Sequence, residues 1–301
     1  MHALITGGSG FIGQALCPAL LARGWQVSVV SRDLHAAAAV LPAGVRLLAD
    51  IDGAGGADAV VNLAGAPLAG QRWTDGYKQV LRESRLRTTE ALLAWMQDLT
   101  LRPAVLVSGS AIGYYGPHED TALTETAPAG EDFGARLAAD WEAAAWPAQD
   151  LGVRTVCLRT GVVLDAGGGA LQQLLTPYRL GLGGPIGSGE QWFSWIHRDD
   201  LVRMILWLID QSTLAGAVNG TAPAPVRQKD FASALGRALH RPTLLPTPGF
   251  ALKAAFGEMG QMLIDGQRVL PARAQGQGFQ FLYPTIDDAL ARILGGVSAE
   301  K

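Results

Sequence analysis

The first thirteen residues constrain the fold of this 301-residue chain more than any other stretch. An apolar run over residues 2–5 predicts a buried strand, which ends at Thr6 and a glycine cluster before a helical pattern begins near Ala15. A strand, a glycine-rich turn and a helix in direct succession are typical of the start of a βαβ unit. We therefore expect an α/β protein whose parallel sheet begins at the N-terminus.

The glycines of this turn have the spacing of a dinucleotide-binding fingerprint. Gly7, Gly10 and Gly13 fit G-x-x-G-x-x-G, and Gly8 with the last two fits G-x-G-x-x-G. A pyrophosphate needs main-chain N–H groups within reach, a Cβ atom would hold it away, and the helix N-terminus adds partial positive charge. A tight turn without a ligand is the alternative. The candidate cofactor-binding residues of the turn are Thr6, Gly7, Gly8, Ser9, Gly10, Phe11, Ile12 and Gly13.

The end of the second predicted strand, residues 26–31, indicates which dinucleotide would bind. In this fold that end faces the adenosine ribose, where an acid would accept from the 2′-hydroxyl and repel a 2′-phosphate. Ser31 occupies the acid's position and Arg32 follows, which favours NADP, while NAD stays possible. Asp33 argues mildly against this preference, although it could instead cap the next turn. An exposed arginine without a ligand is the other interpretation.

Alternation of strands and helices continues to about residue 165, which predicts a Rossmann-type, doubly wound parallel sheet with helices on both faces. Further strands are predicted over residues 45–48, 59–65, 103–110 and 153–158, and helices over 73–96 and 131–146. Several residues near the strand ends are further candidate cofactor contacts. They are Asp50, which could equally end a turn, Leu63, Ala64, Gly65, Ser108, Gly161 and Val162.

Three arginines, Arg82, Arg85 and Arg87, lie on the long predicted helix, where such residues more often form a solvated face. Arg85 is nevertheless kept as a candidate cofactor contact.

After residue 165 the pattern changes. Residues 166–189 and 221–301 predict a smaller, irregular substrate lobe over the cofactor site, while 190–220 return to the first domain. In this part we expect a strand over 192–197 and helices near 171–180, 198–208, 229–239 and 286–294.

Candidate catalytic residues gather where the fifth predicted strand ends, on the same edge as the glycine turn. Ser110 could position a substrate carbonyl, and Tyr114 or Tyr115 could donate a proton, although either ring could simply pack the loop. His197 is a further candidate because imidazole titrates near neutral pH. A lone histidine in an apolar stretch is, however, more often structural.

Composition excludes several function classes. The net charge is −3 without a long basic run, so we expect neither nucleic acid nor an anionic membrane as a partner. Cys17 and Cys157 lie in apolar contexts and predict buried free thiols in a reducing compartment. Neither a signal-peptide pattern nor an apolar run long enough for a membrane span is present, so the cytoplasm is the expected location. No metal site is expected.

Several motifs together resemble the extended short-chain dehydrogenase/reductase superfamily, which contains nucleotide-sugar epimerases and dehydratases. They are residues 6–13, 62–65, 108–110 with 114–116, and 195–200. The chain is most similar to the atypical branch called epimerase family proteins, whose short C-terminal domain has no assigned role. The motifs typical of that branch are residues 73–74, 84–85, 183–189 and 266–271. The resemblance implies a small-molecule substrate and a possible homodimer formed by two helices, near residues 77–96 and 131–146.

One motif of the superfamily is missing. Its Tyr-x-x-x-Lys pair, which moves a proton as hydride moves, should lie on the predicted helix over residues 131–146. Alignment on Glu142 puts Gly134 and Ala138 at the pair, and a shift of one residue puts Phe133 and Leu137 there. Neither alignment supplies a phenol or an amine.

Two interpretations follow from the missing pair. The first is an NADP-dependent oxidoreductase or epimerase-like enzyme that acts on an unidentified small carbonyl or sugar-nucleotide-like substrate through another acid. The second is an NADP(H)-binding redox sensor or regulatory protein with little turnover. The aromatic residues Trp192, Phe193 and Trp195 suit a small-molecule pocket as well as a partner contact.

Overall fold

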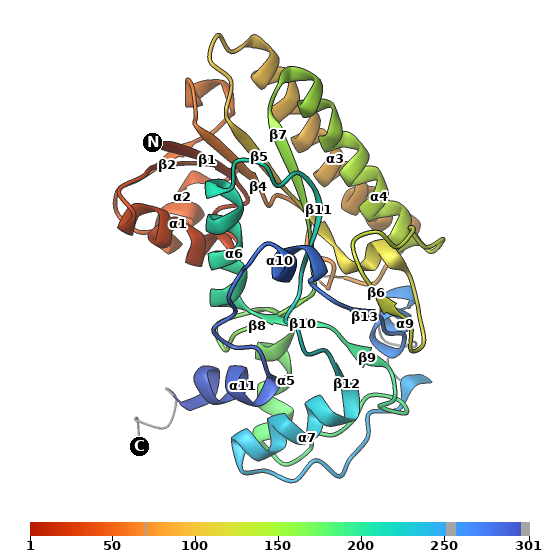
Figure 1. The fold of residues 1–301 in the computed structure, drawn as a ribbon. Helices are drawn as coiled ribbons and strands as arrows, with labels where there is room; N and C mark the ends of the chain where they lie inside the picture. Colours follow the sequence, from red (N-terminus) through yellow and green to blue (C-terminus); the bar gives the residue numbers. More distant parts are fainter. Residues whose placement is uncertain (70, 251–256, 296–301) are drawn as a thin grey trace.

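The computed structural model of the chain describes residues 1–69, 71–250 and 257–295 (Figure 1). The predicted lobe over 221–301 therefore extends into residues 251–256 and 296–301, which lie outside the described residues. Within the described residues, a seven-stranded sheet has the strand order β11-β7-β5-β4-β1-β2-β3, and every neighbouring pair is parallel. The strands are β1 (His2–Thr6), β2 (Gln26–Val30), β3 (Val45–Leu48), β4 (Ala59–Asn62), β5 (Val105–Ala111), β7 (Arg154–Thr160) and β11 (Gly216–Gly220).

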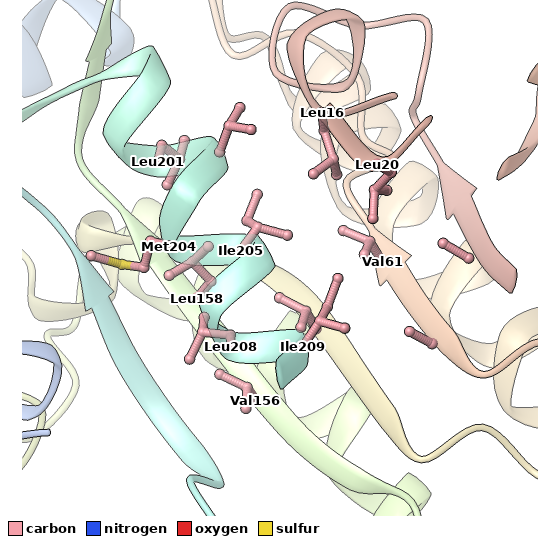
Figure 2. Close-up of a cluster of buried hydrophobic side chains, with 14 of the residues drawn as sticks. Leu16, Leu20, Val61, Val156, Leu158, Leu201, Met204, Ile205, Leu208 and Ile209 are labelled. Atoms are coloured by element: carbon pink, nitrogen blue, oxygen red, sulfur yellow. The ribbon is translucent and has the colours of Figure 1, made fainter. Parts of the chain in front are cut away.

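Helices cover both faces of this sheet (Figure 1), which explains why its strands are continuous apolar runs. On one face lie α1 (Gly13–Ala22) and α6 (Arg198–Asp210), and on the other lie α3 (Asp75–Asp98) and α4 (Phe133–Ala145). Figure 2 shows how the apolar stripe of α6, including Leu201, Ile205 and Leu208, packs toward β7 and toward Leu16 of α1. The predicted Rossmann-type α/β fold is confirmed.

The second part of the chain packs around its own apolar cluster. The helices α5 (Gly169–Arg179), α7 (Gln228–Leu239) and α11 (Ile286–Gly295) contribute Leu175, Phe231 and Leu290 to it. Three two-stranded pairs accompany them: β8 (Val162–Leu164) with β10 (Trp195–His197), β9 (Trp192–Phe193) with β12 (Val226–Arg227), and β6 (Ala122–Leu123) with β13 (Arg268–Val269). Two further short helices of this part are α9 (Glu258–Ile264) and α10 (Ala272–Gly276).

Some predicted elements were wrong. Residues 192–197 do not form one strand: Ser194 separates β9 from β10, because its hydroxyl donates to the Gln267 carbonyl and accepts from the Val269 N–H. Trp195, which the sequence left open as a pocket or partner residue, is fully buried in the second apolar cluster. Short elements also escaped prediction, among them α2 (Leu34–Val40) and the edge strand β11.

Candidate functional site

The glycine turn after β1 is shaped by close main-chain approaches. Gly7 has φ +72°, and a Cβ atom there would lie 2.6–2.8 Å from main-chain atoms of Leu63 and Ala64, just beyond β4. A Cβ on Gly13 would lie 2.3–2.5 Å from the Gly8 main chain. These two glycines are therefore required by the packing of β1, β4 and α1 on one another.

Gly10 differs from these glycines, because a Cβ there would approach only the Gly7 carbonyl oxygen, at 3.1 Å. Helix α1 begins beside it without a side-chain cap, so no side chain satisfies the N–H groups of its first turn. Such a turn can accept an anion at its N-terminus. Phe11 of the same turn packs against the loop that precedes α5, since a Cβ on Gly168 would lie 2.5 Å from its ring.

The end of β2, which pairs with β1, places an exposed arginine near this turn. The Asp33 carboxylate accepts from the Ala36 N–H at 2.9 Å and so caps α2. The Ser31 hydroxyl donates to the Asp33 carbonyl oxygen at 3.0 Å. Arg32 between them is exposed. Asp33 therefore has the structural role of a helix cap, which is the alternative that the sequence offered for it.

A buried polar network joins the carboxyl ends of three adjacent strands. Thr6 of β1 donates to Asn62 of β4 at 2.7 Å, and the Asn62 amide lies 2.8 Å from the Thr89 hydroxyl and 3.4 Å from the Ser108 hydroxyl. Thr6 and Ser108 are at most 2 % exposed. Their side chains therefore hold the strand ends in register at the edge where the glycine turn lies.

The three arginines of α3 have different environments. Arg82 and Arg87 are exposed and pair with Asp140 and Glu83, as expected of a solvated face. Arg85, in contrast, is buried, and its guanidinium donates to the carbonyl oxygens of Leu81 at 2.9 Å and Ala66 at 3.2 Å. Burial lowers the pKa of Arg85 to about 10.

The Arg85 guanidinium borders the loop that follows β4. It lies 5.0 Å from the Trp141 ring, and a Cβ on Gly65 would lie 2.9 Å from its Cζ. Arg85 is thus placed at the carboxyl edge of the sheet, next to the candidate residues Leu63, Ala64 and Gly65.

A buried ion pair that the sequence did not single out organises the end of β5. Glu142 of α4 and Arg159 of β7, both 4 % exposed, make two hydrogen bonds of 2.7 and 2.8 Å. Burial opposes ionisation, but the hydrogen bonds to Glu142 and its charge outweigh this and raise the pKa of Arg159 above its usual value. Ser110 donates to the same carboxylate at 2.7 Å.

The two tyrosines after β5 differ in their environment. Tyr115 is fully buried; its hydroxyl donates to Asn219 at 2.6 Å and accepts from Arg159 at 3.0 Å. Burial raises the pKa of Tyr115, although both partners act in the opposite direction. Tyr114 is half-buried, and its ring centroid lies 3.4 Å from the Arg159 guanidinium. Of the two phenols, Tyr114 is the more accessible.

The three remaining candidates, Asp50, Gly161 and Val162, stabilise the local fold of the main chain. The Asp50 carboxylate accepts from the Gly53 N–H at 3.0 Å, as a turn residue does. A Cβ on Gly161 would lie 2.8 Å from the Ser194 carbonyl oxygen, and Val162 pairs with Trp195 across β8 and β10. The two latter residues hold the second part of the chain close to the end of β7.

His197 ends β10 and is 2 % exposed. Its Nδ1 accepts from the Asp199 N–H at 3.0 Å, which caps α6, and its ring stacks on Tyr283 at 4.1 Å. Nδ1 as acceptor places the proton of the neutral ring on Nε2, which is buried without a hydrogen-bond partner among the described residues. The observed contacts of His197 are those of a helix cap.

Comparison with known proteins adds to this geometry. A sequence profile described as the NAD dependent epimerase/dehydratase family matches residues 3–219. The chain belongs to this family. A second profile, a domain of unknown function named DUF1731, matches residues 247–293.

Relatives within the family cover nearly the whole chain. The epimerase family protein SDR39U1 homolog, chloroplastic, of Arabidopsis thaliana is 40% identical over 98% of this chain and 87% of its own length. The epimerase family protein Mb2239 of Mycobacterium bovis is 42% identical, over 95% of both chains. The crystal structure of human epimerase family protein SDR39U1 with NADPH is 37% identical, with a TM-score of 0.91 over 98% of this chain and 99% of that one.

A narrow slot lies between α4 and the end of β5 in this family member. Gly134, Leu137 and Ala138 of α4 all line it, opposite Ala111 at the end of β5. Among the residues described, no group of three or more His, Cys, Asp or Glu side chains could hold a metal ion. No helix within the same residues combines the length and apolar character needed to cross a membrane. Cys17 and Cys157 are buried free thiols, as predicted.

His197 gives this family member an expected pH dependence of stability. Burial lowers its pKa below the usual value, while Asp165, Asp199 and Asp200 act in the opposite direction. Its contribution to stability is therefore complete above the unfolded pKa of about 6.5 and is lost as pH falls toward the folded pKa. Between these two pKa values we expect the free energy of unfolding, measured with urea, to fall by up to about 1.4 kcal/mol for each unit that the pH is lowered.

The variant His197→Asn keeps a cap acceptor and should lose less stability over the same pH range than the parent protein. The exposed His35→Asn serves as the control and should behave as the parent does. If the free energy of unfolding depended on pH equally in His197→Asn and in the parent protein, His197 would not be the source of this pH dependence.

Proposed function

We propose that this protein is an NADP-dependent oxidoreductase or epimerase-like enzyme that acts on a small carbonyl or sugar-nucleotide-like substrate. The observation that carries the cofactor preference is at the end of β2, where Asp33 caps α2 and Arg32 is exposed beside it. The Asp33 carboxylate is directed to the N-terminus of α2, where the Ala36 N–H and the helix dipole offset part of its charge and so weaken its repulsion of a 2′-phosphate. The NADPH-bound human relative, 37% identical, supports the same cofactor.

The cofactor would lie along the carboxyl edge of the sheet, from β2 to β5. The N–H groups between Gly8 and Gly13 would hold its diphosphate at the uncapped N-terminus of α1. Arg32 and Ser31 would hold the 2′-phosphate, and Asp50 would lie near the adenine. The remaining proposed contacts toward the nicotinamide are Leu63, Ala64, Gly65, Arg85, Ser108, Gly161 and Val162.

When bound, reduced NADP would supply a hydride to a carbonyl carbon, and the carbonyl oxygen must then receive a proton. Tyr114 is the proposed donor, because the hydroxyl of Tyr115 is engaged with Asn219 and Arg159. Ser110 would orient the carbonyl by turning its hydroxyl proton from Glu142 to the carbonyl oxygen, and Glu142 with Arg159 would act as positioning residues. His197 is not assigned a catalytic role here, since its Nδ1 caps α6.

The second candidate is an NADP(H)-binding redox sensor with little turnover. The slot favours it, because Gly134 and Ala138 supply neither a phenol nor an amine beside the expected nicotinamide position. Both candidates share the cofactor. We also propose a cytoplasmic protein that could pair with a second copy through α3 and α4, by analogy with the fold.

Replacing Arg32 with alanine is expected to weaken NADPH binding by roughly tenfold or more while NADH binding changes little. A charge-assisted phosphate contact contributes about 1.5–3 kcal/mol, and NADH lacks that phosphate. Titration calorimetry with each coenzyme measures the effect. Arg87→Ala, which removes an exposed arginine of α3, is the matched control and should change neither affinity.

Equal losses of affinity for both coenzymes in Arg32→Ala would refute the NADP preference.

Turnover separates the two candidate functions. With NADPH and a panel of carbonyl compounds, falling absorbance of the reduced cofactor supports the enzyme. Tight NADPH binding without turnover on any compound supports the sensor.

A further inference from the structure

The slot at the end of β5 has apolar walls. It holds about 30 Å³, and Leu68, Trp73, Leu137, Trp141 and Met262 form most of its surface. A water molecule needs at least about 10–15 Å³ of such volume, so the slot has room for about two heavy atoms. Arg85 is the one charged residue on its wall, within the part of the chain that the structure describes.

Arg85 is held in place by main-chain carbonyl oxygens. Its guanidinium donates to the carbonyl oxygens of Leu81 and Ala66 and stacks near Trp141, so it holds the loop after β4 in place. No side-chain hydroxyl, amide or carboxylate of the described residues lines the slot. A sugar hydroxyl buried there would find no side-chain acceptor for its proton, because the Arg85 guanidinium and the Trp141 indole N–H, which is without a hydrogen-bond partner among the described residues, can only donate.

The slot is closed by α9, which belongs to the segment that matches DUF1731. The Met262 methyl carbon lies 3.5 Å and 3.7 Å from the positions that a Cβ would take on Gly134 and Gly113. Met259, one turn earlier on the same helix, does not line the slot; it packs with Trp73 and Leu137 in an apolar cluster that Met262 also contacts.

An ion pair fixes the N-terminal end of α9 to the first domain. Glu258 pairs with Lys78 of α3 at 2.5 Å, and the Lys78 ammonium lies 5.1 Å from the centre of the Phe133 ring. This ion pair keeps α9, and with it Met262, in place beside the slot.

We infer that this slot receives the apolar end of the substrate, a short alkyl group attached to the reacting carbonyl, and that Met262 sets the length of that group. The inference rests on the proposed function, which places Arg85, a residue that lines the slot, among the contacts toward the nicotinamide. Each buried CH₂ group that fits should strengthen binding roughly fourfold, until the chain reaches Met262.

The test is a series of methyl ketones with alkyl chains of increasing length, titrated by calorimetry into the protein saturated with NADPH. For the parent protein, affinity should rise over the first members and then fall. Met262→Ala removes the side chain beyond Cβ, and the preferred chain should then be longer by about two or three carbons. Met259→Ala, on the same helix, should weaken folding but keep the preference of the parent.

The outcomes separate this inference from the proposed function. Length-dependent ketone binding without NADPH oxidation would support the slot while contradicting the enzyme. Turnover of carbonyl compounds with an unchanged length preference in Met262→Ala would overturn the slot and leave the enzyme standing. If NADPH does not bind, the proposed function fails, and the same titration into the free protein decides the slot: affinity independent of chain length overturns it.

Discussion

Replacing Glu142 with alanine is expected to lower the free energy of unfolding by about 3–5 kcal/mol, because it leaves the buried Arg159 charge without a partner. Both side chains are 4 % exposed, so water cannot replace the lost carboxylate. The Ser110 hydroxyl loses its acceptor in the same variant. Urea unfolding followed by circular dichroism measures the change.

A matched control for Glu142→Ala lies on the same helix. Asp140 pairs with Arg82, but the two side chains are 43% and 53% exposed. Asp140→Ala should therefore cost less than about 1 kcal/mol, as exposed ion pairs do. A loss in Glu142→Ala no larger than in Asp140→Ala would contradict the structural importance of the buried pair.

Gly7→Ala should destabilise the protein by about 2–5 kcal/mol and abolish tight binding of either nicotinamide coenzyme. The positive φ of +72° contributes strain of about 1–2 kcal/mol for a residue with a Cβ. The approach of 2.6 Å to the Leu63 main chain adds an overpacking cost of about 1–3 kcal/mol, because backbone cannot rotate away. Thermal unfolding and coenzyme titration measure the two effects.

Gly24 offers a control that isolates the steric part. Its φ is +76°, but no atom lies within 4 Å of a Cβ built there. Gly24→Ala should therefore show the strain alone and keep its coenzyme affinity. If both alanine variants were equally stable, the close approach between the turn and the loop after β4 would not be what requires glycine at position 7.

The sheet and its edge were predictable because buried parallel strands leave continuous apolar runs in the sequence. The turn after β1 was predictable for the same reason, since its glycines follow directly on such a run. The full burial of Trp195 was not predictable, because an aromatic residue in a short apolar stretch has the same local sequence pattern in a core as in a pocket. Two-residue strands such as β6 and β13 leave no periodic signal at all.

The Glu142–Arg159 pair was missed although the sequence held a signal for it. In α4 the buried residues include Ala138, Trp141 and Ala145, and Glu142 falls within the same helical stripe. An acid on an apolar stripe needs a buried cation, and Arg159 lies inside the apolar run of β7. What sequence could not supply is which cation it meets, because that depends on how α4 packs over the sheet.

The pairing of β6 with β13 has a consequence for anyone who builds chimeras from this family. The Leu270 N–H donates to the Leu123 carbonyl oxygen at 2.9 Å, and the Arg273 N–H donates to the Glu125 carboxylate. The segment that matches DUF1731 is thus joined by hydrogen bonds to the loop that carries Tyr114. A graft that exchanges this C-terminal segment between relatives should exchange Ala122 to Glu125 with it, because the two stretches form one structural unit.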